Sequence, residues 1–252
     1  MFEKARYIQN SFNITFPRRI DIRRKANDFE DTLKGSLEGH YSQPQVIPVP
    51  DELDPEIPRL IFGSKHGFSQ IVITQANLAL NVVYSPDWQM DISRGRHYLL
   101  ERVPILFKLL DILDGVSPHF CGLITKVHLH SQEEDAAILS HLVKLFLKKI
   151  EVRKTYDIEF KITAVFLERF FSNLTIRNYR EWRFAEPQQG IARLSRNSLA
   201  IKGIEIDGDF NDRFAFNEDS KYLSNAGVAS EIIHNGFGEM EKMIERVGGE
   251  SP

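Results

Sequence analysis

Residues 118–151, PHFCGLITKVHLHSQEEDAAILSHLVKLFLKKIE, contain a strand pattern followed directly by a helix pattern. From Phe120 to His130 polar and apolar residues alternate, so that Cys121 and the other odd-numbered residues share one side of a strand. The even-numbered residues, which include His128 and His130, fall on the other and more polar side. We therefore expect one face of this strand to be buried and the other to contact water.

The strand pattern leads into a helix pattern. Ser131 and Glu134 have the spacing of a capping box, and the acidic run at 133–135 would then lie in the first turn, near the positive end of the helix dipole. Apolar residues recur at helical spacing as far as Ile150. The sequence predicts a half-buried strand that leads into an amphipathic helix, and we expect the rest of the chain to pack around this unit.

The composition excludes several classes of protein. The 252 residues carry a formal net charge of -3, which gives no general attraction to nucleic acid or to anionic lipid. The single cysteine, Cys121, excludes an intrachain disulfide, and its place on the apolar side of a strand predicts a buried, unreactive thiol. The sequence shows no secretory signal and no apolar segment long enough to span a bilayer. We expect a cytoplasmic protein with no membrane contact.

The first half of the chain, residues 1–151, is expected to hold strands, a proline-rich connection and two long helices. Residues 7–16 alternate as a half-buried strand. Residues 35–58 contain five prolines, which predicts a long surface connection without continuous regular structure. Short strands follow up to residue 84, and a helix is predicted from about 91 to 113.

The second half, residues 152–252, repeats the order of strands before a helix. Residues 156–184 predict a long antiparallel hairpin with its turn near Ser172 and Asn173. A further strand and a final helix from Asn217 follow. We therefore predict an α+β fold of curved antiparallel sheets with long amphipathic helices packed on one face. Its two loosely similar β-then-α halves are expected to pack as one compact unit.

Several stretches, spread over most of the chain, carry a resemblance. They are NSFNITFP at 10–17, PRLIFGSKHGFSQIVIT at 58–74, NLALNVVY at 77–84, Trp88 just before a helix, and IEIDGDF at 204–210 followed by a helix with Phe237. In these features the chain resembles a sporadically distributed bacterial protein family of similar length and uncharacterised function. The resemblance implies no catalytic residue, so it transfers no site to this chain.

One candidate site combines arginine with aromatic residues. Its members are Arg177, Tyr179, Arg180, Trp182 and Arg183. Proteins that bind single-stranded nucleic acid use guanidinium groups for phosphate and rings for base stacking. In a strand, however, Arg180 and Trp182 would face away from the other three residues. The alternative is a solvated strand face with cross-strand ion pairs and with Trp182 in the core.

A second candidate site is the pair His128 and His130. Two histidines one residue apart point the same way from a strand, and the acids at 133–135 or His141 could add ligands for a metal. The hypothesis is a metal-dependent hydrolase or nuclease. Because the same acids are explained as first-turn helix charges, we do not expect a metal or another cofactor.

The sequence favours a non-enzymatic function. It contains no GxSxG nucleophile motif and no GxGxxG dinucleotide motif. We therefore expect a binding scaffold that recognises another protein through an exposed sheet edge or an apolar groove. It would be a homo-oligomer such as a homodimer, within a bacterial multi-gene system. The nucleic-acid module and the metal enzyme stay open as alternatives.

Overall fold

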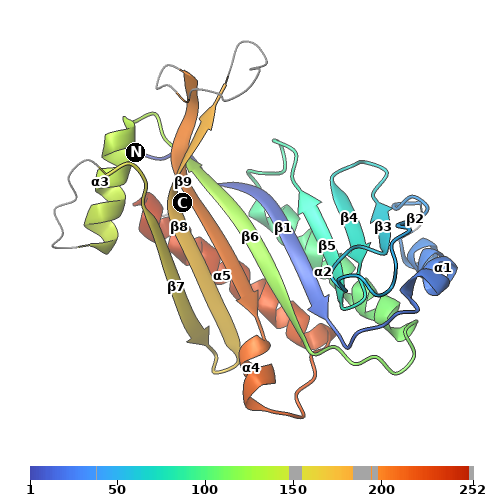
Figure 1. The fold of residues 1–252 in the computed structure, drawn as a ribbon. Helices are drawn as coiled ribbons and strands as arrows, with labels where there is room; N and C mark the ends of the chain where they lie inside the picture. Colours follow the sequence, from blue (N-terminus) through green and yellow to red (C-terminus); the bar gives the residue numbers. More distant parts are fainter. Residues whose placement is uncertain (38, 148–154, 184–193, 195–197, 250–252) are drawn as a thin grey trace.

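One nine-stranded antiparallel sheet forms the framework, in the spatial order β2-β3-β4-β5-β1-β6-β9-β8-β7 (Figure 1). The computed structural model describes residues 1–37, 39–147, 155–183, 194 and 198–249. The strands are β1 Arg6–Thr15, β2 Gln45–Val46, β3 Leu60–Gly63, β4 Ser69–Ile73, β5 Asn77–Val83, β6 Phe120–His130, β7 Glu159–Phe166, β8 Phe170–Trp182 and β9 Leu199–Asn211. The predicted α+β class with antiparallel pairing is therefore confirmed.

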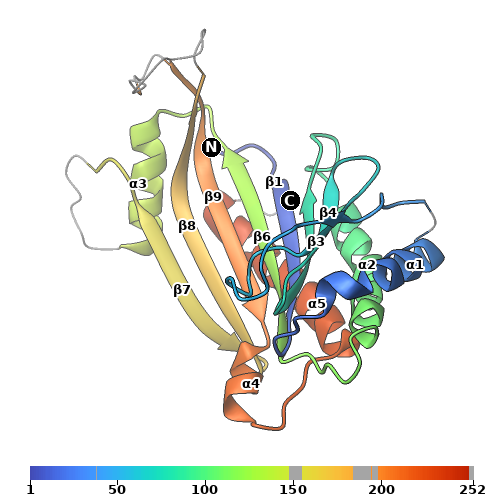
Figure 2. The same cartoon turned by 45° about the vertical axis from the view of Figure 1, so that its right-hand side comes forward.

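Two long helices lie behind the sheet. The helices are α1 Ala26–Ser36, α2 Ile92–Asp111, α3 Asp135–Phe146, α4 Arg213–Glu218 and α5 Ala226–Gly248, with a short 3-10 turn at Ile22–Lys25. Helices α2 and α5 pack against each other and against the same sheet face, and α1 packs beside α2 (Figure 2). None of the described helices combines the length and the apolar composition needed to cross a bilayer.

Strand β6 joins the two parts of the chain. It pairs with β1 on one side and with β9 on the other, so strands from before and after residue 151 belong to the same sheet. Leu123 and Val127 on its helix-facing side are fully buried. The prediction of a strand with one buried face at 120–130 is confirmed, and this strand lies near the middle of the sheet.

The structure corrects the predicted start of α3. No capping box forms at Ser131, because its hydroxyl donates to Met1 O at 2.9 Å and accepts the N–H of Glu133. The helix begins at Asp135, with Glu134 as an N-cap residue that makes no side-chain hydrogen bond. The N-terminal segment therefore competes for the capping hydroxyl, and it holds Ser131 in a bridge with Phe2. The predicted end of this helix, at Ile150, lies outside the described residues.

Two further predicted boundaries are wrong. The hairpin turn lies at residues 167–169, between β7 and β8, whereas Ser172 and Asn173 lie within β8. Leu167 and Glu168 adopt positive φ values of 51° and 54°, which residues other than glycine and asparagine rarely adopt. The turn therefore contains none of the residues from which a turn is usually predicted. The final helix does not begin at Asn217, because the helix there, α4, is short and α5 begins only at Ala226.

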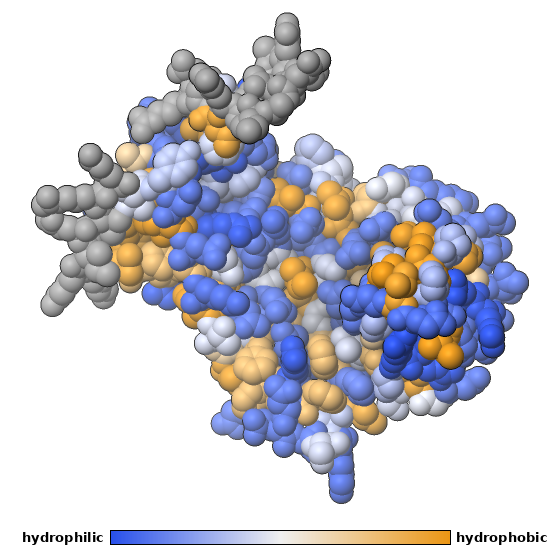
Figure 3. Space-filling model, viewed as in Figure 1, coloured by the Kyte–Doolittle hydropathy of each residue, from blue (hydrophilic) through white to orange (hydrophobic). Residues whose placement is uncertain are grey.

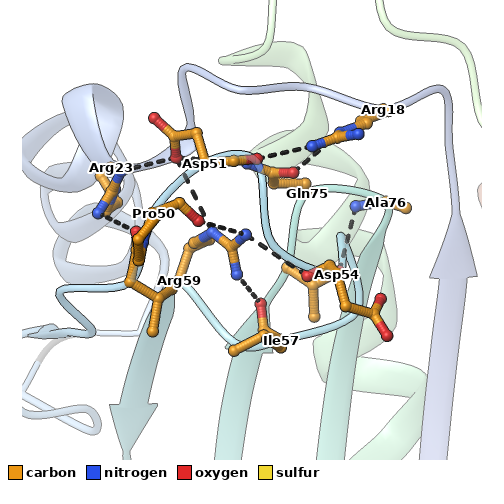
Figure 4. A network of polar contacts seen from close by, with 11 residues as sticks. Arg18, Arg23, Pro50, Asp51, Asp54, Ile57, Arg59, Gln75 and Ala76 are labelled. Atoms are coloured by element: carbon orange, nitrogen blue, oxygen red, sulfur yellow. Dashed lines mark hydrogen bonds and ion pairs between the residues drawn. The ribbon is translucent and has the colours of Figure 1, made fainter.

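The proline-rich connection is organised around a buried arginine (Figure 4). Arg59 is fully buried, and its guanidinium donates to Ile57 O at 2.6 Å and to Pro50 O at 3.4 Å. Asp51 accepts from Arg23 at 2.6 Å and lies 4.0 Å from Arg59. The backbone carbonyls of an irregular segment need hydrogen-bond donors, and the buried Arg59 guanidinium supplies them to Pro50 and Ile57.

We expect Arg59→Met to destabilise the connection selectively. The substitution keeps most of the buried volume but leaves the carbonyls of Pro50 and Ile57 without their donor, at a cost of about 2 kcal/mol. Limited proteolysis should then cut within residues 47–57 faster than in the wild type. Arg18→Met is the matched control, since Arg18 belongs to the same network but is exposed. Equal cleavage rates in all three proteins would contradict this role of Arg59.

Candidate functional site

The sheet face opposite α2 and α5 is polar over β6, β9 and β8. Helix α4 covers its lower end, where Phe214 packs on Phe171 with ring centroids 5.4 Å apart. Over the rest of these three strands no helix of the described residues lies. Figure 3 shows this side of the molecule as mainly hydrophilic, with small apolar patches. The open face therefore displays polar side chains on three hydrogen-bonded strands.

Glu205 of β9 is the centre of this face. Its carboxylate is buried and accepts from His128 Nε2 at 2.7 Å and from Arg177 Nε at 2.8 Å. Lys126 Nζ lies 3.3 Å from the same carboxylate. The register explains the meeting, since Glu205 is directly opposite His128 on β6 and Arg177 on β8. Three basic side chains from two strands thus converge on one carboxylate.

The ionisation of this cluster is strongly biased. Burial would raise the pKa of Glu205, but hydrogen bonds from His128 and Arg177 and the charge of Lys126 outweigh burial and lower the pKa to about 2. The pKa of Asp207, two residues further along β9, shifts in the opposite direction. Its pKa is raised by burial and by the negative charge of Glu205. Glu205 therefore holds its charge, whereas ionisation of Asp207 is less favourable in the folded protein than in a solvated chain.

An aromatic group borders the carboxylate. The rings of His128 and Tyr179 have centroids 4.0 Å apart, and those of His130 and Tyr179 stack at 6.2 Å. Gly203 lies between His130 and Tyr179 in the register, so the two rings meet above a residue without a side chain. The pKa of His130 is lowered, first by burial and then by the charge of Arg6.

The structure divides the predicted arginine and aromatic cluster between the two faces. Arg177 and Tyr179 lie on the open face beside Glu205, whereas the Arg180 side chain is buried on the opposite face. There its guanidinium donates to both carboxylate oxygens of Asp135 at 2.8 Å and links β8 to the start of α3. Trp182 is half-buried at the end of β8, and Arg183 pairs through its backbone with Ser198. The five residues therefore form no single surface.

The charges around Glu205 are already paired. Arg177 also contacts Asp207 at 3.2 Å and Glu159 at 3.4 Å, so one guanidinium serves three carboxylates. Because a phosphate backbone must compete with these acids, the face offers little net positive charge to nucleic acid. The alternative of cross-strand ion pairs agrees with this geometry.

The two histidines have different partners. His128 hydrogen-bonds to Glu205, and His130 stacks on Tyr179. Among residues 1–37, 39–147, 155–183, 194 and 198–249, no group of three or more His, Cys, Asp or Glu side chains is arranged to hold a metal ion. Cys121 is buried, and burial raises the pKa of its thiol well above its usual value.

Lys126 and Glu205 are not among the residues predicted from the sequence to form a site. The alternation in IEIDGDF places Glu205, Asp207 and Asp209 on one strand face, opposite a strand that carries Lys126. That pattern could have indicated an acidic ladder. It could not have indicated that β9 lies between β6 and β8, which brings the acids between two rows of basic residues.

No protein-family model matches the chain. No curated protein matches it either. The resemblance to a sporadically distributed bacterial family therefore stays a prediction.

Proposed function

We propose that this protein is a non-enzymatic scaffold that binds another protein by strand addition at the edge strand β7. The observation that supports this most is the position of β7 at the end of the sheet order. It is eight residues long and pairs only with β8 among the described residues. A long unpaired edge displays backbone donors and acceptors that an extended segment of a partner can use.

The register defines which backbone groups face outward. Asn178 N–H donates to Ile158 O, so residues 158 and 178 form a hydrogen-bonded pair. In an antiparallel ladder such pairs alternate with pairs that bond to the next strand. Glu159, Lys161, Thr163 and Val165 therefore direct their N–H and C=O groups away from β8. These four residues form the predicted docking edge, which we call the β7 edge.

Side-chain exposure agrees with a binding role. No residue of β7 is buried, and the apolar Phe160, Ile162 and Phe166 on its helix-facing side are only half-buried. Val165, on the other side, is 43% exposed. A partner strand beside β7 would cover these apolar groups as well as satisfy the backbone. The opposite edge strand, β2, has two residues and is too short for this purpose.

The paired charges on the open face would contribute specificity rather than affinity. Glu159 lies on the β7 edge and is joined to Glu205 through Arg177. A charged side chain of the partner near Glu159 would interact with the ion pairs that Arg177 forms with Glu159 and Glu205. Wrongly charged segments would therefore be rejected.

Lys161→Pro tests the proposal. Proline removes an outward N–H and leaves the ladder to β8 intact, so the fold is expected to survive while strand addition is blocked. Lys161→Ala is the matched control, because it removes the same exposed side chain and keeps the N–H. Affinity purification of the wild type and of Lys161→Ala should recover a partner protein. With Lys161→Pro we expect the amount of that protein to be at least tenfold lower, as measured by quantitative mass spectrometry.

The mass in solution distinguishes two occupants of the edge. If the wild type is a dimer and Lys161→Pro is a monomer by light scattering, the partner is a second copy of the chain. A monomeric wild type whose bound proteins are unchanged by Lys161→Pro would exclude the β7 edge as the binding site. The division at residue 151 into two similar β-then-α halves, the cytoplasmic location and the bacterial multi-gene system stay predictions alongside this function.

A further inference from the structure

A cleft of about 350 Å³ lies far from the β7 edge, near the other end of the strand order. Its lining includes His40, Phe68 from the turn before β4, Trp88 from the segment after β5, and Arg94, Tyr98 and Arg102 from α2. The last three residues are four apart, so they share one face of the helix. The volume lies within the usual range for small-molecule sites.

Three aromatic rings form the walls of the cleft. Phe68 and Tyr98 have ring centroids 5.4 Å apart, Phe68 and Trp88 5.8 Å, and Trp88 and Tyr98 6.1 Å. Tyr98 is buried, whereas Phe68 and Trp88 are only half-buried. Large rings that stay accessible beside a cavity offer stacking surfaces to a planar ligand.

Two arginines place positive charge on these walls. The Arg94 guanidinium lies 4.4 Å from the centre of the Trp88 ring, and that of Arg102 lies 3.5 Å from the centre of the Tyr98 ring. Glu101 approaches Arg102 Nη1 at 3.2 Å and also pairs with His97 at 3.1 Å. The lining of the cleft therefore contains two permanently charged arginines, Arg94 and Arg102, and one carboxylate, Glu101. The lowered pKa of His40, due first to burial and then to Arg102 and His66, agrees with a positive local potential.

Arg102 also has an unused donor. The residue is 9% exposed, and its Nε has no hydrogen-bond partner among the described residues. An unpaired buried donor costs free energy, so the Arg102 guanidinium keeps hydrogen-bonding capacity that the protein itself does not use. The α2 position of this side chain is held by its Nη1 bond to Tyr98 O at 3.4 Å.

We propose that this cleft binds a small planar aromatic anion, a ring that carries a carboxylate or a phosphate group. The ring stacks against Trp88 and Phe68, and the anionic group binds Arg102 with help from Arg94. This site is independent of the proposed strand addition at β7, since it uses different strands and helix α2.

Isothermal titration calorimetry with four probes tests the site. Adenosine 5′-monophosphate combines ring and phosphate, indole-3-carboxylate combines ring and carboxylate, and adenosine and inorganic phosphate supply one feature each. We expect at least one ring-bearing anion to bind tenfold more tightly than adenosine or phosphate. Whichever of the two anions binds identifies phosphate or carboxylate as the preferred group.

Variants on α2 show whether the arginines are responsible. Arg102→Met should weaken binding at least tenfold, and Arg94→Met several-fold. Arg94 is exposed, so its loss should leave the fold intact even if Arg102→Met does not fold. Arg96→Met is the matched control on the same helix and should bind as the wild type does. The proposal is overturned if neither ring-bearing anion binds at millimolar concentration, or if Arg94→Met and folded Arg102→Met bind unchanged.

Discussion

Glu205→Gln is expected to lower the free energy of unfolding by about 3 kcal/mol at pH 7. The decrease of the pKa from 4.5 to about 2 corresponds by linkage to an effect of about this size. The neutral amide would turn an N–H2 group toward the guanidinium of Arg177 and leave Lys126 unpaired. Urea unfolding measures the loss, and the melting temperature should fall by roughly 10 °C.

The effect should depend on pH in one direction. The pKa of Glu205 is lowered in the folded protein, so its stabilisation is present above pH 4.5 and is lost as the pH falls toward 2. Glu205→Gln lacks a group that titrates there. The stability of the wild type should therefore decrease more steeply than that of the variant between pH 4.5 and 2, and the difference between them should shrink.

Asp207→Asn provides the matched control. This carboxylate lies on the same strand face and also contacts Arg177, but its folded-state pKa is raised, by burial first and then by Glu205. An acid with a raised pKa costs stability when it is ionised, so its replacement should change the free energy of unfolding at pH 7 by less than about 1 kcal/mol. If Asp207→Asn were as damaging as Glu205→Gln, the cluster would not be centred on Glu205.

Gly203→Ala is expected to destabilise the protein at least as much as Glu205→Gln does. The free energy of unfolding should fall by more than about 3 kcal/mol. A Cβ atom at this position would overlap Leu129 O and lie 2.9 Å from Leu129 C, which are backbone atoms of the neighbouring central strand. Backbone in the middle of a sheet can move only if the β6 and β9 pairing changes. Thermal unfolding should show a large loss, and the change should also separate the stacked rings of His130 and Tyr179.

Gly238→Ala shows whether the loss is specific to the sheet. Gly238 lies on α5, and an added Cβ would meet nothing within 4 Å. Because alanine favours a helix over glycine, this variant should gain up to about 1 kcal/mol. Opposite signs for the two glycines are the expected result. A mild effect of Gly203→Ala would mean that β6 and β9 adapt more easily than their close approach indicates.

Local pattern determined most elements of this fold. The alternation at 120–130 predicts β6 with its buried face, because side chains of a strand point to opposite sides and only one side contacts the helices. Apolar residues at helical spacing predict helix α2, and they predict helix α5 from Ala226 onwards. The start of α3 could not be predicted in this way, since a distant segment, Met1 and Phe2, engages Ser131.

The sequence by itself determined which residues share a face, and the tertiary structure decided which faces meet. It placed Arg177 with Tyr179 and His128 with His130, because those relations depend only on strand periodicity. Only the pairing of β9 with both β6 and β8 brought Glu205 between His128 and Arg177. Strand order depends on how the whole core packs, and the residues of a single strand carry no signal for their neighbours across the sheet.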